Sequence, residues 1–310
     1  MKAVRIHRFG GPEVLTFDDL PVPRPRDGEV VVKVCAASVN PVDYKIRAGS
    51  YPAVREGQLP VVMGRDVSGV IERCGAHAGE FMEGDPVFAM VGPDRGGQAE
   101  YVLLKTAELA LKPTELSHVE AAAVPLAGLT AWQGLFDHGL LQPGQRVLIL
   151  GASGGVGHFA VQFAKSKGCW VAATASGEGV DFVRRLAADQ VVDYTKDLFE
   201  EQVEPVDLVF DLVDGDSRER AWKLVKRGGR LVSTLTEPSQ DRAKAGGVTA
   251  MRYTVHPSGA QLAEIAALVS ARKVMPHVTV TYPFEKVVQA EQELEKGHMR
   301  GKMVLQVAAA

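Results

Sequence analysis

A short apolar run, Leu148–Leu150, leads directly into the glycine-dense segment Gly151–Gly157. A helix-like segment, 158–167, follows, so the order is strand, tight turn and helix. A glycine at 154 lets the backbone approach a phosphate closely, and a glycine at 157 lets the helix pack tightly on the strand. The helix N-terminus offers unpaired N–H groups and the positive end of its dipole. The pattern predicts a dinucleotide site whose phosphate-binding turn comprises Ala152, Ser153, Gly154, Gly155, Val156 and Gly157.

Length and charge narrow the class of protein. The chain has 310 residues and a formal net charge of −3, which favours roughly two domains and argues against nucleic acid or an anionic membrane as a partner. The N-terminus has no apolar stretch of the signal-peptide kind, and the longest uncharged run, 121–136, is too short to span a bilayer. Three widely spaced cysteines are typical of reduced thiols, so we expect a cytoplasmic protein.

The order of predicted elements divides the chain into three parts. Residues 1–119 read as many short strands separated by glycine turns, which favours a compact β-barrel. Residues 120–257 alternate strands and helices, which indicates a parallel sheet with both faces covered. Residues 258–310 continue beyond a complete sheet, so we expect them to rejoin the first part. The prediction is an α/β chain with a catalytic domain of 1–119 and 258–310 around a nucleotide-binding domain of 120–257.

Individual elements can be assigned from periodicity and capping. Ser117 and Glu120 have the spacing of a capping box, and Pro283 is expected at the first position of a helix over 283–296 that Gly297 ends. Further strands are predicted at 30–35, 67–72, 86–90, 100–104, 147–150, 170–174, 190–193, 206–213, 230–235 and 302–307. Further helices are predicted at 180–186, 217–225 and 258–271.

Several short motifs, taken in order, resemble the zinc-free quinone and enone oxidoreductases of the medium-chain dehydrogenase/reductase superfamily, the zeta-crystallin-like branch. The motifs are 36–43 (AASVNPVD), 64–70 (GRDVSGV), 84–88 (GDPVF), 97–101 (GQAEY), 129–132 (LTAW) and 300–304 (RGKMV). The resemblance spans nearly the whole chain. It implies a GroES-like domain split around a Rossmann domain, a small-molecule substrate and often a homodimer. Alanine at 152, in the first slot of the glycine motif, is usual for this branch.

Zinc ligands are missing where zinc members of the superfamily carry them. Those proteins have cysteine at the position of Asn40 and a His-Glu pair at Arg65-Asp66. Amide and guanidinium groups are not ligands in such sites. No cysteine lies between Gly84 and Glu100 either, so the structural zinc lobe is absent. We expect no bound metal.

The second strand of the nucleotide-binding part indicates which dinucleotide binds. NAD sites usually have an acid at the end of this strand, but here it ends with Thr174 and Ser176, which leave room for a 2′-phosphate and can hydrogen-bond it. Glu178 lies beyond the strand between two glycines, as a solvated loop charge would. Arg184 or Arg185 could neutralise the phosphate. The sequence therefore predicts NADP(H) over NAD(H).

The resemblance implies further cofactor contacts. Tyr194 matches a residue at the adenosine phosphate end, and Thr130 matches one on the nicotinamide side. Leu212, Val213 and Leu235 end later strands, where ligands bind in open α/β sheets. His256 is a candidate near the nicotinamide, although an ordinary loop histidine is the slightly favoured alternative.

Candidate catalytic residues gather just after the first motif. Reduction of an α,β-unsaturated carbonyl places negative charge on the oxygen, which donors or cations must stabilise in the absence of zinc. By the resemblance, Lys45 is the first candidate for contacting cofactor or substrate, because enone reductases carry lysine there; an ordinary surface lysine is the alternative. Tyr44 is the second candidate, and Asn40 could donate through its amide. Asp43 is expected to orient its neighbours. Arg65 is either a cationic side chain of the active site or a structural ion-pair partner.

These observations predict an NADPH-dependent oxidoreductase that passes hydride to a quinone or to an activated carbon–carbon double bond, without zinc. The sequence does not separate the two acceptor classes. The alternative is a non-catalytic NADPH-binding sensor or structural protein of the same fold. A zinc alcohol dehydrogenase is disfavoured by the missing ligands.

Overall fold

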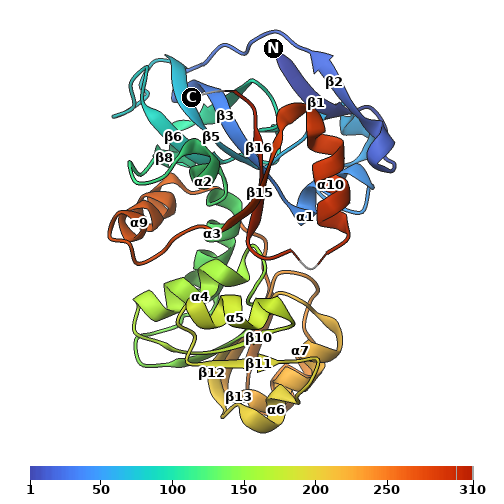
Figure 1. The fold of residues 1–310 in the computed structure, drawn as a ribbon, viewed down its shortest axis with the longest axis vertical. Coiled ribbons are helices and arrows are strands. Elements are labelled where there is room, and N and C mark those ends of the chain that lie inside the picture. The colour runs from blue at the N-terminus through green and yellow to red at the C-terminus, as the bar shows by residue number, and fades with distance from the viewer. Residues whose placement is uncertain (298, 309–310) are drawn as a thin grey trace. The chain divides into compact units, whose positions relative to one another are not determined.

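The computed structural model describes residues 1–297 and 299–308. It divides into two compact units (Figure 1). Unit 1 comprises 1–126, 256–272 and 276–310, and unit 2 comprises 127–255 and 273–275. The divisions fall at 126/127 and 255/256, with residues 273–275 also in unit 2, whereas the sequence predicts boundaries at 119/120 and 257/258.

Unit 1 is built on antiparallel sheets. The larger has the order β15-β16-β3-β5-β6-β8, with β7 also paired to β3, and the smaller has the order β2-β1-β4. The return of the chain is direct, because β16 pairs with β3 through Met303 opposite Val39. The strands are β1 (Lys2–Ile6), β2 (Leu15–Asp19), β3 (Glu29–Val39), β4 (Val61–Val62), β5 (Asp66–Cys74), β6 (Pro86–Met90), β7 (Tyr101–Lys105), β8 (Leu109–Leu111), β15 (Val278–Pro283) and β16 (Lys302–Gln306).

Among the described residues, four α-helices lie within unit 1, and α3 begins just before its boundary. Ser117 caps α2 as predicted, since its Oγ accepts from the Glu120 N–H at 3.2 Å while the Glu120 carboxylate accepts from the Ser117 N–H at 2.8 Å. Helices α1 and α10 pack together beside the smaller sheet (Figure 1). The helices are α1 (Pro41–Arg47), α2 (His118–Ala122), α9 (Gly259–Ser270) and α10 (Val287–Glu295); α3 spans Pro125–Trp132.

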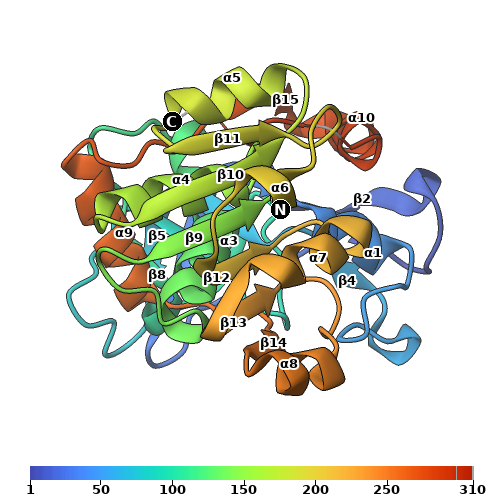
Figure 2. The same ribbon diagram turned by 90° about the horizontal axis from the view of Figure 1, so that it is seen from below.

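Unit 2 contains a parallel six-stranded sheet with the order β11-β10-β9-β12-β13-β14 (Figure 2). In chain order this is 3-2-1-4-5-6, the doubly wound Rossmann arrangement, in which ligands bind where the order reverses. That point lies between β9 and β12, and the glycine turn follows β9. The strands are β9 (Arg146–Leu150), β10 (Trp170–Ala175), β11 (Gln190–Asp193), β12 (Val206–Asp211), β13 (Val225–Ser233) and β14 (Thr249–Arg252).

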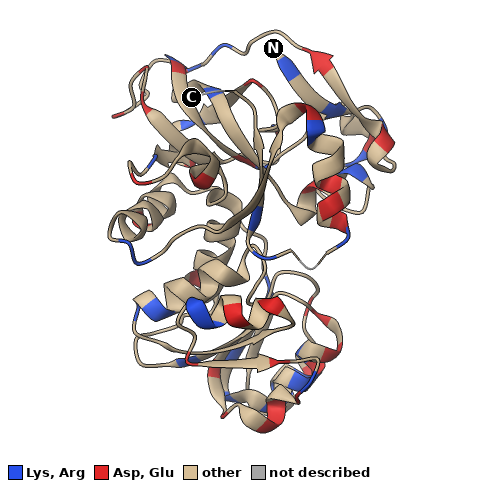
Figure 3. Cartoon of the chain, in the orientation of Figure 1, with Lys and Arg blue, Asp and Glu red and all other residues tan. Residues whose placement is uncertain are grey.

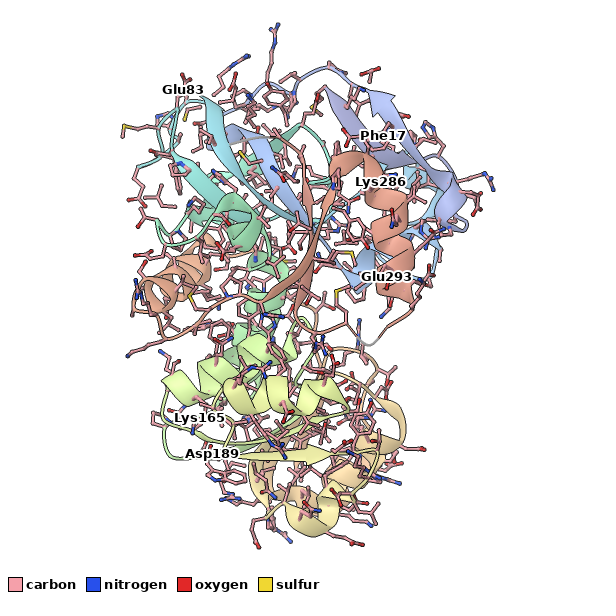
Figure 4. The ribbon with its side chains drawn as sticks, in the orientation of Figure 1. Phe17, Glu83, Lys165, Asp189, Lys286 and Glu293 are labelled. Carbon is pink, nitrogen blue, oxygen red and sulfur yellow. The ribbon has the colours of Figure 1, made fainter. Side chains whose placement is uncertain are left out.

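Helices α4 and α5 pack on this sheet through buried apolar side chains. An ion pair between Lys165 and Asp189, 2.8 Å long, adds a polar link beside β10 (Figure 4), and the same Asp189 carboxylate accepts from the Val171 N–H at 2.7 Å. The helices are α4 (Gly157–Ser166), α5 (Glu178–Arg185), α6 (Phe199–Gln202), α7 (Gly215–Ala221) and α8 (Gln240–Gly246), with a π-helical turn over Gln133–His138.

One predicted helix start is wrong. Pro283 is the last residue of β15, with an extended ψ of 149°, and α10 begins only at Val287 after a short 3-10 turn. Residues 278–283 alternate half-buried and exposed side chains and pair with β16. Pro283 therefore belongs to the strand because it pairs with Gln306 of β16. The helix ends before Gly297, which has a φ of +79°.

No helix in the described ranges is long and apolar enough to cross a membrane. The three cysteines are free thiols, with Cys35 and Cys169 buried. Burial raises the pKa of each of these two thiols, which keeps them protonated and unreactive.

Candidate functional site

The glycine turn has the shape that a bound phosphate needs. A Cβ built on Gly154 would meet no atom closer than 3.6 Å, whereas one on Gly157 would lie 2.4 Å from the Gly151 carbonyl oxygen. Gly154 thus borders open space, and Gly157 is required for the tight packing of α4 against the turn. Gly151 has a φ of +79°, which glycine adopts without strain.

The same turn presents free donors. No hydrogen bond among the described residues takes up the backbone N–H of Ser153, Gly155, Val156 or Gly157. These groups lie at the N-terminus of α4, a ten-residue helix whose dipole favours an anion there. A pyrophosphate requires unpaired N–H groups next to a glycine, because any side chain there would fill the space that the phosphates occupy. The residues present therefore fit a dinucleotide.

Two buried polar side chains shape the neighbouring strand ends. Asp211, at the end of β12, accepts from the Val213 N–H at 3.1 Å and from the Ser233 hydroxyl at 2.8 Å. Ser233, at the end of β13, in turn accepts from the Leu235 N–H at 3.2 Å. Val213 also packs on the glycine turn, because a Cβ on Gly151 would lie 2.6 Å from its Cγ1. The predicted contacts Leu212, Val213 and Leu235 thus lie on segments fixed by Asp211 and Ser233.

A cavity of about 280 Å³ lies between α5 and β11. Its charged lining residues are Asp181, Arg184, Asp193, Lys196 and Asp197. Arg184 is paired with Asp181 at 2.9 Å, and Lys196 with Asp193 at 3.1 Å. Both cations are largely exposed, so these pairs are weak and can exchange for another anion.

Of the residues predicted to bind the 2′-phosphate, Arg184 lines this cavity, whereas Ser176, Tyr194 and Thr174 do not. The Ser176 hydroxyl donates to the Tyr194 hydroxyl at 3.3 Å, which brings together two candidates that are 18 residues apart. Arg184, not Arg185, lines the cavity. Thr174 is buried, and its Oγ1 accepts from the Gly151 N–H at 3.2 Å, so it holds the glycine turn from within.

Two further predicted cofactor residues, Thr130 and His256, lie in different units of the structure. Thr130, on α3, is buried and its carbonyl accepts from the Tyr253 hydroxyl. His256 is exposed and belongs to unit 1, so the residues of the nucleotide-binding unit do not include it.

A buried polar network lies at the N-terminal end of α1. The Asn40 amide donates to Asp66 Oδ2 at 2.9 Å and to Ser38 Oγ at 3.2 Å, and its oxygen accepts from the Lys302 ammonium. Lys302 also lies 3.6 Å from Asp66. With both amide hydrogens engaged and the side chain buried, Asn40 has no free donor for a substrate, and we now propose that it positions its neighbours instead.

Asp43, in the first turn of α1, accepts a hydrogen bond from the backbone of the N-cap residue Asn40, as a residue that orients its neighbours would. Its Oδ2 accepts from the Asn40 N–H at 2.8 Å, and its Oδ1 has no partner among the described residues. Burial first, and then the nearby Glu291 carboxylate, raise the pKa of Asp43 to about 8. The carboxyl is therefore protonated at neutral pH.

This protonation predicts a dependence of stability on pH. A folded-state pKa of about 8 lies above the ordinary value of 3.8, so the folded protein holds a proton that the unfolded chain releases. The stabilisation is complete below pH 3.8, declines as pH rises, and is lost above about pH 8. Asp43→Asn mimics the protonated acid without titrating. We expect urea midpoints measured from pH 5 to 9 to fall more steeply for the wild type than for Asp43→Asn; parallel profiles would contradict the assignment.

Arg65 bonds to backbone carbonyls, and no ion pair of its side chain occurs among the described residues. It is buried, and its Nη1 donates to the carbonyls of Gly92 at 2.8 Å and Arg95 at 3.0 Å. It therefore holds the loop after β6 in place. A guanidinium engaged by carbonyls in this way is a poor candidate for binding a substrate oxygen.

Tyr44 and Lys45 contrast with these engaged groups. Both side chains are half-buried on α1, and within the described ranges no hydrogen bond or ion pair involves the Tyr44 hydroxyl or the Lys45 ammonium. Burial raises the pKa of Tyr44, which keeps its hydroxyl protonated. Helix α1 thus carries two free hydrogen-bond donors, the groups that developing negative charge on an oxygen requires.

The residues that replace zinc ligands do not form a metal-binding set. No group of three or more histidine, cysteine, aspartate or glutamate side chains suited to a metal occurs in the described part of the chain. The positions in question hold Asn40, Arg65 and Asp66, whose side chains bond to other protein groups.

Comparisons with known proteins agree with this fold. Residues 26–114 match the family described as alcohol dehydrogenase GroES-like domain, and residues 186–305 match that described as zinc-binding dehydrogenase. The mitochondrial NAD(P)H oxidoreductase RTN4IP1 of Mus musculus is 36% identical over 99% of this chain and 89% of its own length. The chloroplastic NADPH-dependent alkenal/one oxidoreductase of Arabidopsis thaliana is 37% identical over 98% and 79%.

A solved structure is equally similar. The quinone oxidoreductase from Coxiella burnetii superposes with a TM-score of 0.91 at 35% identity, over 99% of both chains. The chain therefore belongs to the medium-chain dehydrogenase/reductase family, in the group of quinone oxidoreductases and alkenal/one reductases. It is an NAD(P)H-dependent oxidoreductase with a GroES-like domain and a Rossmann domain.

Some residues that organise the site escape sequence reasoning. Arg47 and Glu291 are 244 positions apart, yet they form a fully buried ion pair. Asp211 looks like an ordinary strand end. Only Lys302 gives a signal, since a lysine that begins the apolar strand 302–306 requires a buried partner.

Proposed function

We propose that the protein is an NADPH-dependent reductase of quinones or α,β-unsaturated carbonyl compounds that works without zinc. The observation that carries the proposal is the pair of free donors, Tyr44 and Lys45, beside residues that engage one another where zinc members have ligands. The names of the relatives in Arabidopsis and Coxiella support both acceptor classes.

The chemistry assigns a role to each group. Bound NADPH would supply a hydride to an electron-poor carbon of the acceptor. Lys45, as a cation, and Tyr44, as a neutral donor, stabilise the negative charge that then appears on the acceptor oxygen. A proton from Tyr44, Lys45 or water completes the reduction. Asn40 and Asp43 hold the helix that carries both donors.

The choice of NADPH rests on the region around the second strand. Ser176 and Tyr194 offer hydroxyls where NAD sites carry an acid. The exposed side chains of Arg184 and Lys196 can exchange their aspartate partners for a phosphate. The cavity also holds three aspartates against these two cations. We therefore expect a moderate preference for NADPH, with NADH still accepted.

Substitution of Arg184 tests this preference. We expect Arg184→Gln to lower kcat/KM for NADPH by about tenfold, the effect of losing one charge-assisted phosphate contact, with kcat/KM for NADH nearly unchanged. Arg185→Gln is the matched control, since Arg185 is exposed on the same helix and does not line the cavity. Equal losses with both coenzymes, or equal effects of both variants, would refute the assignment.

Steady-state NADPH oxidation with a panel of quinones, enones and alkenals tests the function itself. We expect turnover with at least one acceptor class. Tight NADPH binding with no oxidation above background would instead support the non-catalytic sensor.

A metal assay of tag-free protein is expected to find far less than one zinc per chain. We further propose a cytoplasmic location and a homodimer, which fractionation and light scattering would test.

A further inference from the structure

Helix α1 is held at its C-terminal end by a second buried network. Arg47 Nε donates to Glu291 Oε2 at 2.7 Å, Nη2 to Glu295 Oε2 at 2.9 Å, and Nη1 to the Gly10 carbonyl at 2.9 Å. The Arg47 and Glu291 side chains are 1% and 0% exposed. Acidic residues gather on α10, the partner helix (Figure 3). All three nitrogens of one guanidinium thus connect α1 to two other segments.

The two ends of α1 are therefore fixed by unrelated parts of the sequence. At the first end, Lys302 of β16 and Asp66 of β5 bind Asn40. At the second end, α10 binds Arg47. Between them lie Tyr44 and Lys45, whose side chains have no such partners among the described residues. In a seven-residue helix, which is too short to be stable by itself, these tertiary contacts set where its side chains lie.

Buried ion pairs are an expensive way to gain stability, because desolvation cancels much of the attraction and apolar packing would serve as well. They do impose direction, since the N–H groups of a guanidinium donate to their partners in one plane. Their presence at both ends of a short helix that carries free donors indicates a geometric purpose.

We propose that Arg47 with Glu291, and Lys302 with Asp66 and Asn40, are positioning residues that fix Tyr44 and Lys45 for the reduction. The inference rests on the proposed function of these two donors. Positioning errors of about 1 Å can lower rates a hundredfold, so loosening either end lowers kcat while the nucleotide-binding unit stays intact.

The test uses a neutral, similar-sized replacement of the buried pair, Arg47→Met/Glu291→Gln, in the full chain. We expect at least a tenfold fall in kcat, a change of less than twofold in the Kd of NADPH, and faster amide exchange over residues 40–48. Arg47→Lys, which keeps the charge but not the fork, is expected to recover part of kcat; it also carries the test if the double variant does not fold. The matched control is Arg95→Met/Glu108→Gln, a partly buried 2.8 Å pair of unit 1 whose other side-chain hydrogen bonds in the described ranges go to Asp94, Leu103 and Lys105, not to α1. This control should leave kcat unchanged.

Combination with Lys45→Met and Tyr44→Phe separates positioning from general weakening. Positioning acts through these donors, so the loss from Arg47→Met/Glu291→Gln should nearly vanish once both are removed. A loss of the same size in both backgrounds, or an equal loss in the Arg95/Glu108 control, would overturn the inference. If the donor variants alone keep full kcat, the donor assignment fails as well and the inference with it. Amide exchange that is unchanged over 40–48 would refute the anchoring even in a protein without turnover.

Discussion

Gly154→Ala is expected to lower the affinity for NADPH by about a hundredfold, or about 2.8 kcal/mol, without unfolding the protein. The Cβ would meet the nearest protein atom, the Gly151 carbonyl oxygen, at an ordinary 3.6 Å. It would therefore occupy only the open space that the proposed pyrophosphate needs. Fluorescence titration with NADPH, together with thermal unfolding of the free protein, measures both halves of this expectation.

Gly157→Ala provides the contrast within the same turn. Its Cβ would lie 2.4 Å from the Gly151 carbonyl oxygen and 2.6 Å from the Ala152 Cα, so the backbone itself must shift. We expect a clear loss of stability in this variant, as well as weaker binding. Normal NADPH affinity in Gly154→Ala would show that the phosphates bind elsewhere, and the account of the glycine turn would be wrong.

Lys45→Met is expected to lower kcat with the best acceptor by about a hundredfold, the usual effect of removing one donor from a developing oxyanion. Methionine keeps the length of the side chain and removes only the charged donor. Tyr44→Phe, which removes the second donor, is expected to lower kcat by about tenfold. Measurement of kcat and KM for the acceptor, with the Kd of NADPH taken separately, distinguishes acceptor contact from cofactor contact.

The control for this prediction is Lys33→Met. Lys33 is an exposed lysine of the same unit, on β3, and its replacement should leave kcat, KM and the Kd of NADPH unchanged. If Lys45→Met also left activity and cofactor affinity at wild-type values, Lys45 would be an ordinary surface lysine, and the proposed chemistry of α1 would have to be abandoned.

Local patterns predicted most of the fold. The capping pair Ser117 and Glu120 and the glycine turn depend on contacts within a few residues, and the structure confirms both. Pro283 misled because proline suits both a first helical turn and a strand end, and pairing with β16 decides between them. Helix α1 was not predicted at all, since seven residues show little periodicity.

The candidate site was predictable in part, for a similar reason. Sequence identifies donors but not their partners. Asn40 has a suitable amide, yet Asp66 and Ser38 engage both of its hydrogens. Arg65 has a suitable charge, yet its guanidinium donates to two backbone carbonyls. Tyr44 and Lys45 remain candidates because no side-chain partner reaches them from the part of the chain that the structure describes. Such partners come from distant segments, which sequence alone does not place.

The most direct test of the central claim follows the hydride itself. NADPH labelled with deuterium at C4 of the nicotinamide would be incubated with the protein and an α,β-unsaturated ketone or a quinone, and the products analysed by mass spectrometry and NMR. We predict one reduced acceptor for each NADPH oxidised and, for the ketone, one deuterium on the β-carbon, delivered from one face of the nicotinamide only. Bound NADPH that stays reduced with every acceptor would contradict the account and leave a dinucleotide-binding protein without turnover.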